Sequence, residues 1–416
     1  MAKRILVYAD WQGLPETIQV GTLNAETTRG KEIFSFEYMP KWLQAPQAQI
    51  LDPDLQLYSG PQFLNDEKPN FGMFLDSSPD RWGRVLMKRR EAILARQEDR
   101  RIQPLMESDF LLGIYDGTRM GGLRFKYTED GEFLSHATEL AAPPWVSLRD
   151  LEYASQRLEN EDMNATEELR WLNMLLAPGS SLGGARPKAS VTDPNGGLWI
   201  AKFPSVNDDH DIGGWEMVVY ELAVNCGIRV SQSQLGKYSG KHHTFLTNRF
   251  DRNSGQRIHF ASAMTLLSQQ DGADFNNGVS YLDIAGFIIQ NGQQVNENLL
   301  ELWKRMLFNI LVKNTDDHLR NHGFLLRGDG WELSPAYDMN ANPSGQGLTL
   351  NISDDDNSLD PELALSVATY FRLAASDAEK ILENMIGQVT QWRTIAGKHG
   401  MSRREQENMS AAFFGK

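Results

Sequence analysis

The densest group of chemically versatile side chains lies in residues 314–324, NTDDHLRNHGF, between two apolar stretches. The segments GFLL and WELS that follow flank the turn RGDG, residues 327–330, and predict a β-hairpin. A hairpin brings its two ends together, so Asp316 and Asn321 before it should lie near Asp338 after it. Two carboxylates and one amide oxygen form a hard oxygen set suited to Mg²⁺, with the phosphates of a substrate completing its coordination.

The five-residue step from Asp316 to Asn321 allows the two side chains to divide their work. The aspartate would face a substrate hydroxyl while the asparagine binds the metal, and Asp338 would be the second metal ligand. This is the arrangement of the D-x-x-x-x-N catalytic loop of protein kinases. The spacing therefore indicates phosphoryl transfer.

Phosphoryl transfer also needs a lysine on the ATP phosphates. Lys202 in WIAKF lies on a predicted strand directly before a predicted helix, which is where kinases place that lysine. Glu216 or Glu221 on the helix is predicted to pair with it. An ordinary strand lysine and ordinary surface glutamates are the alternative interpretation.

A glycine-containing segment, GSSLGGARPK at residues 179–188, precedes this strand. The backbone of Gly183 and Gly184 is predicted to approach phosphates, with Lys188 nearby. The segment fits neither G-x-x-x-x-G-K-[ST] nor G-x-G-x-x-G, and a plain turn would have a similar composition.

The elements that must position these residues are mixed helices and strands. Short strands are predicted over most of the first ~140 residues, together with a basic helix in DRWGRVLMKRREAILARQEDRR, and the prolines of LAAPP at residues 140–144 mark a boundary. One polar helix is predicted over residues 148–176, followed by a strand pair around the turn NGG at residues 195–197. Helical patterns dominate after residue 251, including a capping box that begins at Ser280.

Composition limits the possible partners and compartments. The 41 Lys and Arg residues against 55 Asp and Glu give a formal net charge of −14, which disfavours direct binding of nucleic acid. The single cysteine, Cys226, excludes an internal disulfide, is predicted to be buried, and indicates a reducing cytoplasm. No apolar run approaches the ~18 residues of a membrane span, and the N-terminus lacks the apolar core of a signal peptide.

Taken together, these segments resemble the HipA family of bacterial serine/threonine kinases, the toxin components of toxin-antitoxin pairs. The matching stretches are GSSLGGARPKA, IAKFP, NRFDR, NTDDHLRNHGFLL and SPAYDMN, in family order. The first domain, with VYADWQG, VGTL, FSFEYMPKWL and GGLRF, is similar to the family's β-rich N-terminal module. The resemblance implies an α+β, two-lobed, protein-kinase-like fold: a β-rich module over residues 1–142, a nucleotide-binding small lobe over 143–250 and a helical catalytic lobe over 251–416.

The resemblance also implies a role for each matching residue. Asp316 would be the catalytic aspartate, Asn321 and Asp338 would hold Mg²⁺, and Lys202 would bind the ATP phosphates. The family places adenine against the hinge segment NRFDR, which here contains Asn248 and Phe250.

A second set of implied features concerns regulation and partners. Ser181, or its neighbour Ser180, falls where the family carries an autophosphorylated serine, a modification that would add roughly −2 charge beside the phosphate site. The family phosphorylates translation proteins, notably an aminoacyl-tRNA synthetase, and pairs with a small helix-turn-helix antitoxin that binds operator DNA.

Some features depart from the family pattern or admit other interpretations. Asp317 stands where the family often has glycine, and its carboxylate is expected to be solvated, with a contribution to metal binding as the alternative. Asn248 replaces a hinge glutamate found in some members, although a backbone contact with adenine would survive that change. His318 is predicted to stiffen the loop by hydrogen bonding, while His318 and His322 together have a spacing that could bind zinc. A metal-dependent phosphohydrolase built on the same acidic loop and an inactive kinase-fold binding module are the rival functions.

Overall fold

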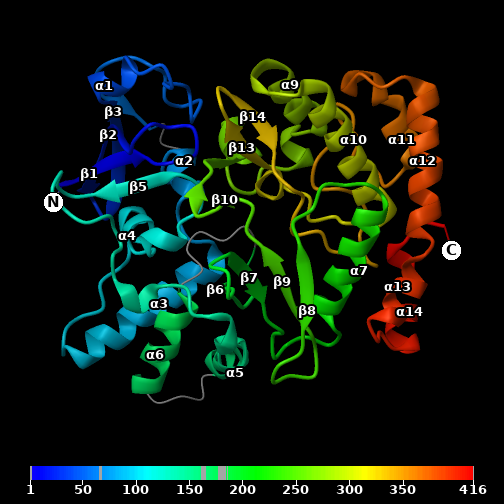
Figure 1. Ribbon diagram of the computed structural model, residues 1–416, viewed down its shortest axis with the longest axis horizontal. Helices are drawn as coiled ribbons and strands as arrows, with labels where there is room; N and C mark the ends of the chain where they lie inside the picture. Colours follow the sequence, from blue (N-terminus) through cyan, green and yellow to red (C-terminus); the bar gives the residue numbers. More distant parts are fainter. Residues whose placement is uncertain (1, 65–67, 161–164, 177–183, 185, 416) are drawn as a thin grey trace. The chain divides into compact units, whose positions relative to one another are not determined.

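The computed structural model describes residues 2–64, 68–160, 165–176, 184 and 186–415 (Figure 1). The chain forms two compact units. Unit 1 comprises Met1–Val206 and Asn248–Ala261, and unit 2 comprises Asn207–Thr247 and Ser262–Lys416. These bounds do not coincide with the three segments expected from the sequence. No helix in the described part of the chain has the length and apolar character needed to cross a membrane.

The N-terminal part of unit 1 is a five-stranded antiparallel sheet in the order β4-β3-β2-β1-β5. Its strands are β1 (Ala2–Ala9), β2 (Ile18–Thr28), β3 (Lys31–Tyr38), β4 (Gln62–Phe63) and β5 (Leu123–Lys126). The short strands predicted from RILVYAD, IQVGTL and EIFSFEY are therefore confirmed. Aromatic side chains such as Phe36, Phe74 and Phe125 pack in the core of this part.

The helices of unit 1 are α1 (Pro40–Leu43), α2 (Gly72–Asp76), α3 (Arg81–Gln97), α4 (Glu107–Leu112), α5 (Leu148–Glu159) and α6 (Ala165–Leu175), with 3₁₀ turns at Asp116–Thr118, Thr138–Leu140 and Trp145–Ser147. The basic helix is confirmed as α3. The single helix predicted over residues 148–176 is wrong, because α5 ends at Glu159 with Asn160 as its C-cap. The apolar residues of α5 and of α6 both follow helical spacing, so the sequence suggested one continuous helix. Asn160 is the C-cap of α5 and was the local signal for the end of this helix.

Two further strand pairs of unit 1 form short hairpins. β6 (Lys188–Thr192) pairs with β7 (Leu198–Lys202) around the predicted NGG turn, where Gly196 has φ +84°. β10 (Arg252–Asn253) pairs with β11 (Gln256–Arg257), and β12 is Phe260–Ser262. The backbone N–H of Arg249 donates to the carbonyl of Leu198 at 2.9 Å, so the predicted hinge segment lies beside β7.

Unit 2 is mainly helical. It contains α7 (Ile212–Asn225), β8 (Ser233–Gly236), β9 (Thr244–Asn248), α8 (Ala263–Leu266), α9 (Tyr281–Asn291), α10 (Val295–Leu311), β13 (Gly323–Arg327), β14 (Gly330–Leu333), α11 (Pro361–Ser366), α12 (Ala375–Val389), α13 (Trp392–Lys398) and α14 (Arg403–Met409). Further 3₁₀ turns are Phe275–Asn277, Leu319–Asn321, Ala368–Phe371 and Ser410–Ala412.

Helix α10 is the centre of the unit 2 core. Twelve of its side chains are buried, among them Trp303, Leu307 and Leu311. The Ser280 capping box predicted for α9 is present, because Ser280 Oγ accepts from the Asp283 N–H at 3.2 Å. Cys226 is buried as predicted, and burial raises the pKa of its thiol to about 12. The core thus provides a rigid base for the loop that follows α10.

Candidate active site

The loop between α10 and β13 presents Asp316 to solvent. The side chain of Asp316 is 71% exposed, whereas its neighbours Asp317 and Asn321 are buried. The amide nitrogen Nδ2 of Asn321 donates to the backbone carbonyl of Asp316 at 2.7 Å, which closes the loop upon itself. The asparagine therefore fixes the backbone from which the exposed carboxylate extends.

The other end of the Asn321 amide is available to a cation. Its oxygen, Oδ1, is buried and has no hydrogen-bond partner among the described residues. A buried amide oxygen without a donor costs free energy unless something else binds it. Because Nδ2 is held by the Asp316 carbonyl, this orientation of Oδ1 is fixed, and the atom suits an Mg²⁺ ligand.

The β13–β14 hairpin returns the chain toward this loop, as the sequence predicted. Arg327 and Gly330 are paired across its two-residue turn. Two residues before Asn340, Asp338 adopts a left-handed backbone with φ +56°. Tyr337 Oη donates to the carbonyl of Arg320 at 2.6 Å, so the residues adjoining Asp338 and Asn321 are in direct contact.

A second contact ties the same two segments together. The backbone N–H of Asn340 donates to Asn314 Oδ1 at 3.2 Å, and that of Asn342 donates to the carbonyl of Lys313 at 3.1 Å. Asn340 Nδ2 lies 3.4 Å from Asp338 Oδ1. The geometry brings the segments carrying Asp316, Asn321 and Asp338 to one place, and their oxygens are of the chemical type that a hard divalent cation prefers.

Asp317 corrects the expectation of a solvated carboxylate. The side chain points inward, where Oδ2 accepts from Tyr281 Oη at 2.8 Å and Oδ1 accepts from the Thr349 N–H at 2.6 Å. Burial raises the pKa of Asp317 to about 7, although both hydrogen bonds favour the ionised form. The sequence did not indicate this burial, because the hydrogen-bond partners come from α9 and from residue 349, which are distant from Asp317 in the chain.

An amide network that the sequence did not reveal continues beneath the loop. Asn309 Nδ2 donates to Tyr281 Oη at 2.9 Å, and Asn314 Nδ2 donates to Asn309 Oδ1 at 3.0 Å. Together with Asp317 and the Asn340 N–H, these buried side chains connect α9, α10 and the segment after β14. Asn309, one of four buried polar residues on α10, was the available signal.

The two histidines of the loop have different environments. His318 Nε2 lies 3.8 Å from Asp316 Oδ1, and its Nδ1 is buried without a partner among the described residues. The ring of His322 is buried, lies against Tyr281 and has Nε2 3.1 Å from the Asp317 carbonyl. Burial lowers the pKa of His322 to about 3. The ring of His322 faces the loop backbone. No three His, Cys, Asp or Glu side chains in the described ranges form a group that could bind a metal such as zinc.

In unit 1, Lys202 ends β7 and is buried. Its cross-strand partner is Lys188, so the two side chains lie on the same face of the hairpin. Lys188 Nζ donates to Asp80 Oδ2 at 2.8 Å and to the Gly184 carbonyl at 3.1 Å. Asp80 thereby neutralises Lys188, a pairing across more than a hundred positions that no sequence pattern indicated.

The other predicted residues are distributed between the two units. Glu216 on α7 of unit 2 is buried, whereas Glu221 accepts from Lys398 at 2.9 Å and from His399 at 2.8 Å. Glu221 is therefore already engaged. Phe250 lies in unit 1, where its ring packs 6.1 Å from that of Phe260. Ser180, Ser181 and Gly183 lie outside the described residues.

Comparisons with known proteins identify the family and the fold of the chain. The family described as the HipA-like C-terminal domain matches residues 180–393, just over half of the chain. A Haemophilus influenzae protein that is provisionally named a kinase is 27% identical over 179 residues, which cover 38% of this chain and 52% of that protein. The chain thus matches about half the length of this relative.

Two solved structures are also similar. HipA of Shewanella oneidensis, in a complex with HipB and its operator DNA, has a TM-score of 0.65 at 18% identity, covering 94% of this chain and 92% of the other. This match shows a shared fold over nearly the whole chain. The Helicobacter pylori proinflammatory kinase CtkA has a TM-score of 0.34 at 14% identity, covering 51% of this chain and 94% of the other.

Proposed function

The chain belongs to the family of the HipA-like C-terminal domain, and from this premise we propose that it is an ATP- and Mg²⁺-dependent serine/threonine protein kinase. The observation that carries the proposal is the state of Asn321. One end of its amide is held by the Asp316 backbone, while the buried oxygen at the other end has no partner among the described residues. A cation ligand placed five residues after an exposed aspartate matches what phosphoryl transfer to a hydroxyl requires.

Each residue at the loop has a distinct proposed role. The exposed Asp316 carboxylate orients the acceptor hydroxyl and accepts its proton. Asn321 Oδ1 and the Asp338 carboxylate would hold Mg²⁺, which when bound neutralises charge on the nucleotide phosphates. His318 would limit the motion of Asp316 from 3.8 Å away.

The nucleotide contacts are proposed for unit 1. Lys202 would bind the ATP phosphates, while the backbone of Asn248 and Phe250 would meet adenine. Because Asp80 holds the ammonium group of Lys188, we assign Lys188 to supporting Gly184 through its backbone carbonyl. The three-segment division at residues 142 and 250 belongs to the same proposal.

The acceptor and the regulation follow from family membership. We propose a protein acceptor, with a translation protein such as an aminoacyl-tRNA synthetase as the first candidate, and autophosphorylation of Ser181 or Ser180. A HipB-like antitoxin is the proposed partner, because the similar Shewanella structure contains HipB. Cytoplasmic location is part of the proposal.

The decisive experiment measures phosphate transfer from labelled ATP to the purified chain itself. Asp316→Ala should reduce transfer at least ~10³-fold, a loss of about 4 kcal/mol of transition-state stabilisation. Asp355→Ala, in the exposed acidic loop of unit 2, is the matched control and should retain full transfer. Full transfer by Asp316→Ala would contradict the assignment.

Two further readouts test the metal and the modified residue. Asn321→Ala should raise the Mg²⁺ concentration needed for half-maximal transfer, because one oxygen ligand is lost. Mass spectrometry of the active protein should find phosphate on Ser181 or Ser180, and an unmodified serine pair would remove the autophosphorylation proposal. Release of inorganic phosphate from phosphoesters without transfer from ATP would favour the phosphohydrolase. The side chain of Asp317 points inward, so that enzyme would have one carboxylate fewer for binding a metal.

A further inference from the structure

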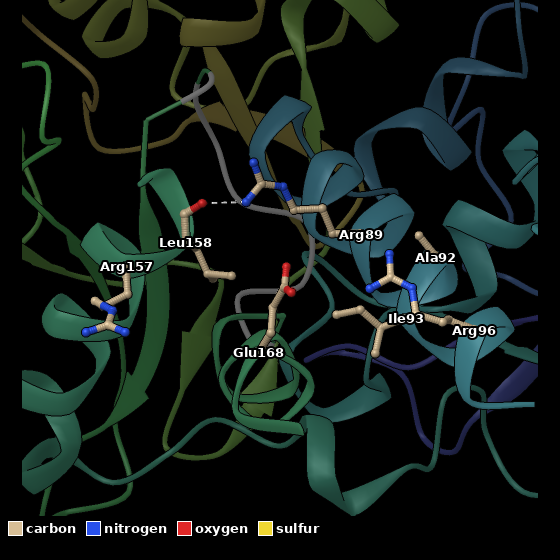
Figure 2. Close-up of a pocket in the computed structure, with 7 residues that line it drawn as sticks. All are labelled: Arg89, Ala92, Ile93, Arg96, Arg157, Leu158 and Glu168. Atoms are coloured by element: carbon tan, nitrogen blue, oxygen red, sulfur yellow. Dashed lines mark hydrogen bonds between the residues drawn. The ribbon is translucent and has the colours of Figure 1, made fainter. Parts of the chain in front are cut away.

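In unit 1, the arginines at one helix junction bind the chain itself. A hollow of about 270 Å³ lies among α3, α5 and α6 (Figure 2). Arg89 Nη1 donates to the Leu158 carbonyl at 2.5 Å, and Arg157 Nη1 donates to Tyr153 Oη at 3.0 Å. This hollow is therefore a helix junction, and its lining indicates no particular ligand.

The buried polar side chains of α10 in unit 2 are arranged differently, because they form a single stripe. They are Asn298, Glu301, Arg305 and Asn309, separated by steps of three, four and four residues. An α-helix has 3.6 residues per turn, so these steps keep all four on one face over about 16 Å of the helix. Buried charges and amides are unfavourable unless they are hydrogen-bonded. The partners of the stripe therefore show what it holds in place.

The middle of the stripe holds the backbone that leads from β14 to Asp338. Arg305 and Glu301 are both buried and form an ion pair. Arg305 Nη2 donates to Glu301 Oε1 and to the carbonyl of Ser334, each at 2.7 Å. The guanidinium thus fixes a backbone carbonyl four residues before Asp338, while Glu301 neutralises its charge.

Two further contacts hold the same stretch of backbone. The N–H of Leu333 donates to Asn298 Oδ1 at 3.1 Å. The N–H of Ala336 donates to the carbonyl of Arg229 at 2.7 Å, and the N–H of Arg229 donates to Glu301 Oε1 at 3.0 Å. The chain before Asp338 is therefore held to α10 both directly and through Arg229.

The far end of the stripe holds the backbone on the other side of Asp338. Asn309 Oδ1 accepts from Asn314 Nδ2 at 3.0 Å, and Asn314 Oδ1 accepts from the N–H of Asn340 at 3.2 Å. Asp338 thus lies between two stretches that one helix face fixes, and its own φ is +56°. For a residue with a Cβ this left-handed conformation costs free energy, and it persists where the surroundings determine it.

We propose that Arg305 is a positioning residue for Asp338, and that it acts through the Ser334 carbonyl to hold the Asp338 carboxylate where a divalent cation can bind it. The inference rests on the proposed function and goes beyond it, because Arg305 itself touches neither the cation nor the nucleotide. The same helix supports the loop that carries Asp316 through Asn309. One rigid element therefore fixes the positions of both carboxylates.

Binding of Mn²⁺ in place of Mg²⁺ tests the proposal without relying on activity. Mn²⁺ is titrated into the full-length chain with a non-hydrolysable ATP analogue, and free Mn²⁺ is measured by electron paramagnetic resonance. The double variant Glu301→Gln/Arg305→Met removes the buried pair without leaving an unpaired charge. Its Kd for Mn²⁺ should rise about 10-fold. In the transfer assay the Mg²⁺ concentration for half-maximal activity should rise in parallel, and transfer at saturating Mg²⁺ should stay near that of the wild type.

Three further variants calibrate this measurement. Asp338→Asn loses one ligand oxygen and should raise the Kd for Mn²⁺ at least as much as the double variant. Val389→Ala removes buried methyl groups from α12 of the same unit, so it should lower stability to urea and leave the Kd unchanged. Arg305→Lys keeps a cation beside Glu301 and a donor for the Ser334 carbonyl, and should recover most of the affinity.

If the double variant fails to fold, Asn314→Ala tests the other end of the stripe, since it removes the acceptor of the Asn340 N–H and should also raise the Kd. A Kd that rises in Asp338→Asn and stays at the wild-type value in the stripe variant would overturn the role of the stripe and leave the kinase proposal intact. An equal rise in Val389→Ala would overturn that role as well. An unchanged Kd in Asp338→Asn would overturn both proposals, because Asp338 would then not hold the cation.

Discussion

Asp251 and Asp317 are both fully buried, but their carboxylates have opposite kinds of hydrogen-bond donor. Asp251 of unit 1 accepts from Arg249 Nη2 and from Arg252 Nη1, each at 2.6 Å, and from the Gly121 N–H at 2.9 Å. Burial alone would raise the pKa of Asp251, but the two arginine charges outweigh it and hold the pKa well below its usual range. Asp317 of unit 2 has neutral hydrogen-bond donors, and burial raises its pKa to about 7.

The difference follows what each region must do. The ion network around Asp251 extends through Arg257 and Asp116 and fixes the hinge segment to residues 116–124 within unit 1. The network around Asp317 lies beneath a loop whose oxygens are proposed to bind a cation. A positive charge at that place would weaken cation binding, and the neutral donors Tyr281 and Thr349 avoid it.

The largest effect is expected from removing the carboxylate of the ionic network. Asp251→Ala would leave Arg249 and Arg252 buried without their shared carboxylate, and unfolding free energy should fall by about 3–5 kcal/mol. Urea unfolding measures the loss, and hydrogen exchange should locate it in residues 116–124 and 248–261. If Asp251→Ala lost no more unfolding free energy than the exposed control Asp355→Ala, the ionic network would not be a source of stability.

A smaller loss is expected in the neutral network. Asp317→Ala leaves the Tyr281 hydroxyl and the Thr349 N–H without their acceptor, which should cost about 2–4 kcal/mol in the same urea assay. Asp317→Asn keeps an acceptor for Thr349 and should cost less. If the alanine and asparagine variants were equally stable, the two hydrogen bonds would not be the source of the effect.

Removing one hydroxyl tests how firmly the network supports the loop. Tyr281→Phe removes the donor to Asp317 and the acceptor of Asn309, and should cost about 1–2 kcal/mol. On the proposed function, it should also lower kcat several-fold while the KM for ATP stays unchanged, because Tyr281 contacts the loop and not the nucleotide. An unaltered kcat would separate the network from the positioning of Asp316.

The comparison also predicts a difference in pH dependence. The pKa of Asp317 is about 7 in the folded chain and about 4 when unfolded, so between these values the folded state binds the extra proton. Stability from this group is therefore present at low pH and is lost as the pH rises toward 7, by at most about 1.4 kcal/mol per pH unit. Asp317→Asn should remove this slope.

The pKa of Asp251 is lowered on folding, so its contribution has the opposite sign. That stability is present above the unfolded pKa and is lost as the pH falls through the folded value. Unfolding measured from pH 2 to pH 8, for wild type, Asp251→Asn and Asp317→Asn, would show the contrast. Parallel curves for wild type and Asp317→Asn would contradict the raised pKa.

Features that depend on neighbouring residues were predictable from the sequence. The NGG and RGDG turns, the Ser280 capping box and the burial of Cys226 each depend on a few adjacent side chains, and the structure has all of them. Hairpin closure then predicted that the Asp316 loop and the Asp338 segment would meet, and the Tyr337–Arg320 contact joins them.

Features that depend on distant partners were not predictable. Asp317 is followed by a histidine in a polar loop, so nothing local distinguishes it from a solvated carboxylate. Its burial depends on Tyr281, 36 positions earlier, and on Thr349, 32 positions later. Lys188 likewise looked available to phosphates until Asp80, 108 positions away, was found beside it.

By itself the sequence determined the chemical types and their order: an aspartate, an amide five residues later, a hairpin and a second aspartate, because turn and strand preferences act over short distances. Only the tertiary structure decided which of two adjacent aspartates faces solvent, that Asp80 neutralises Lys188, and which end of the Asn321 amide has no partner among the described residues. Those outcomes depend on desolvation and on hydrogen-bond partners, and packing assembles both from residues far apart in the chain.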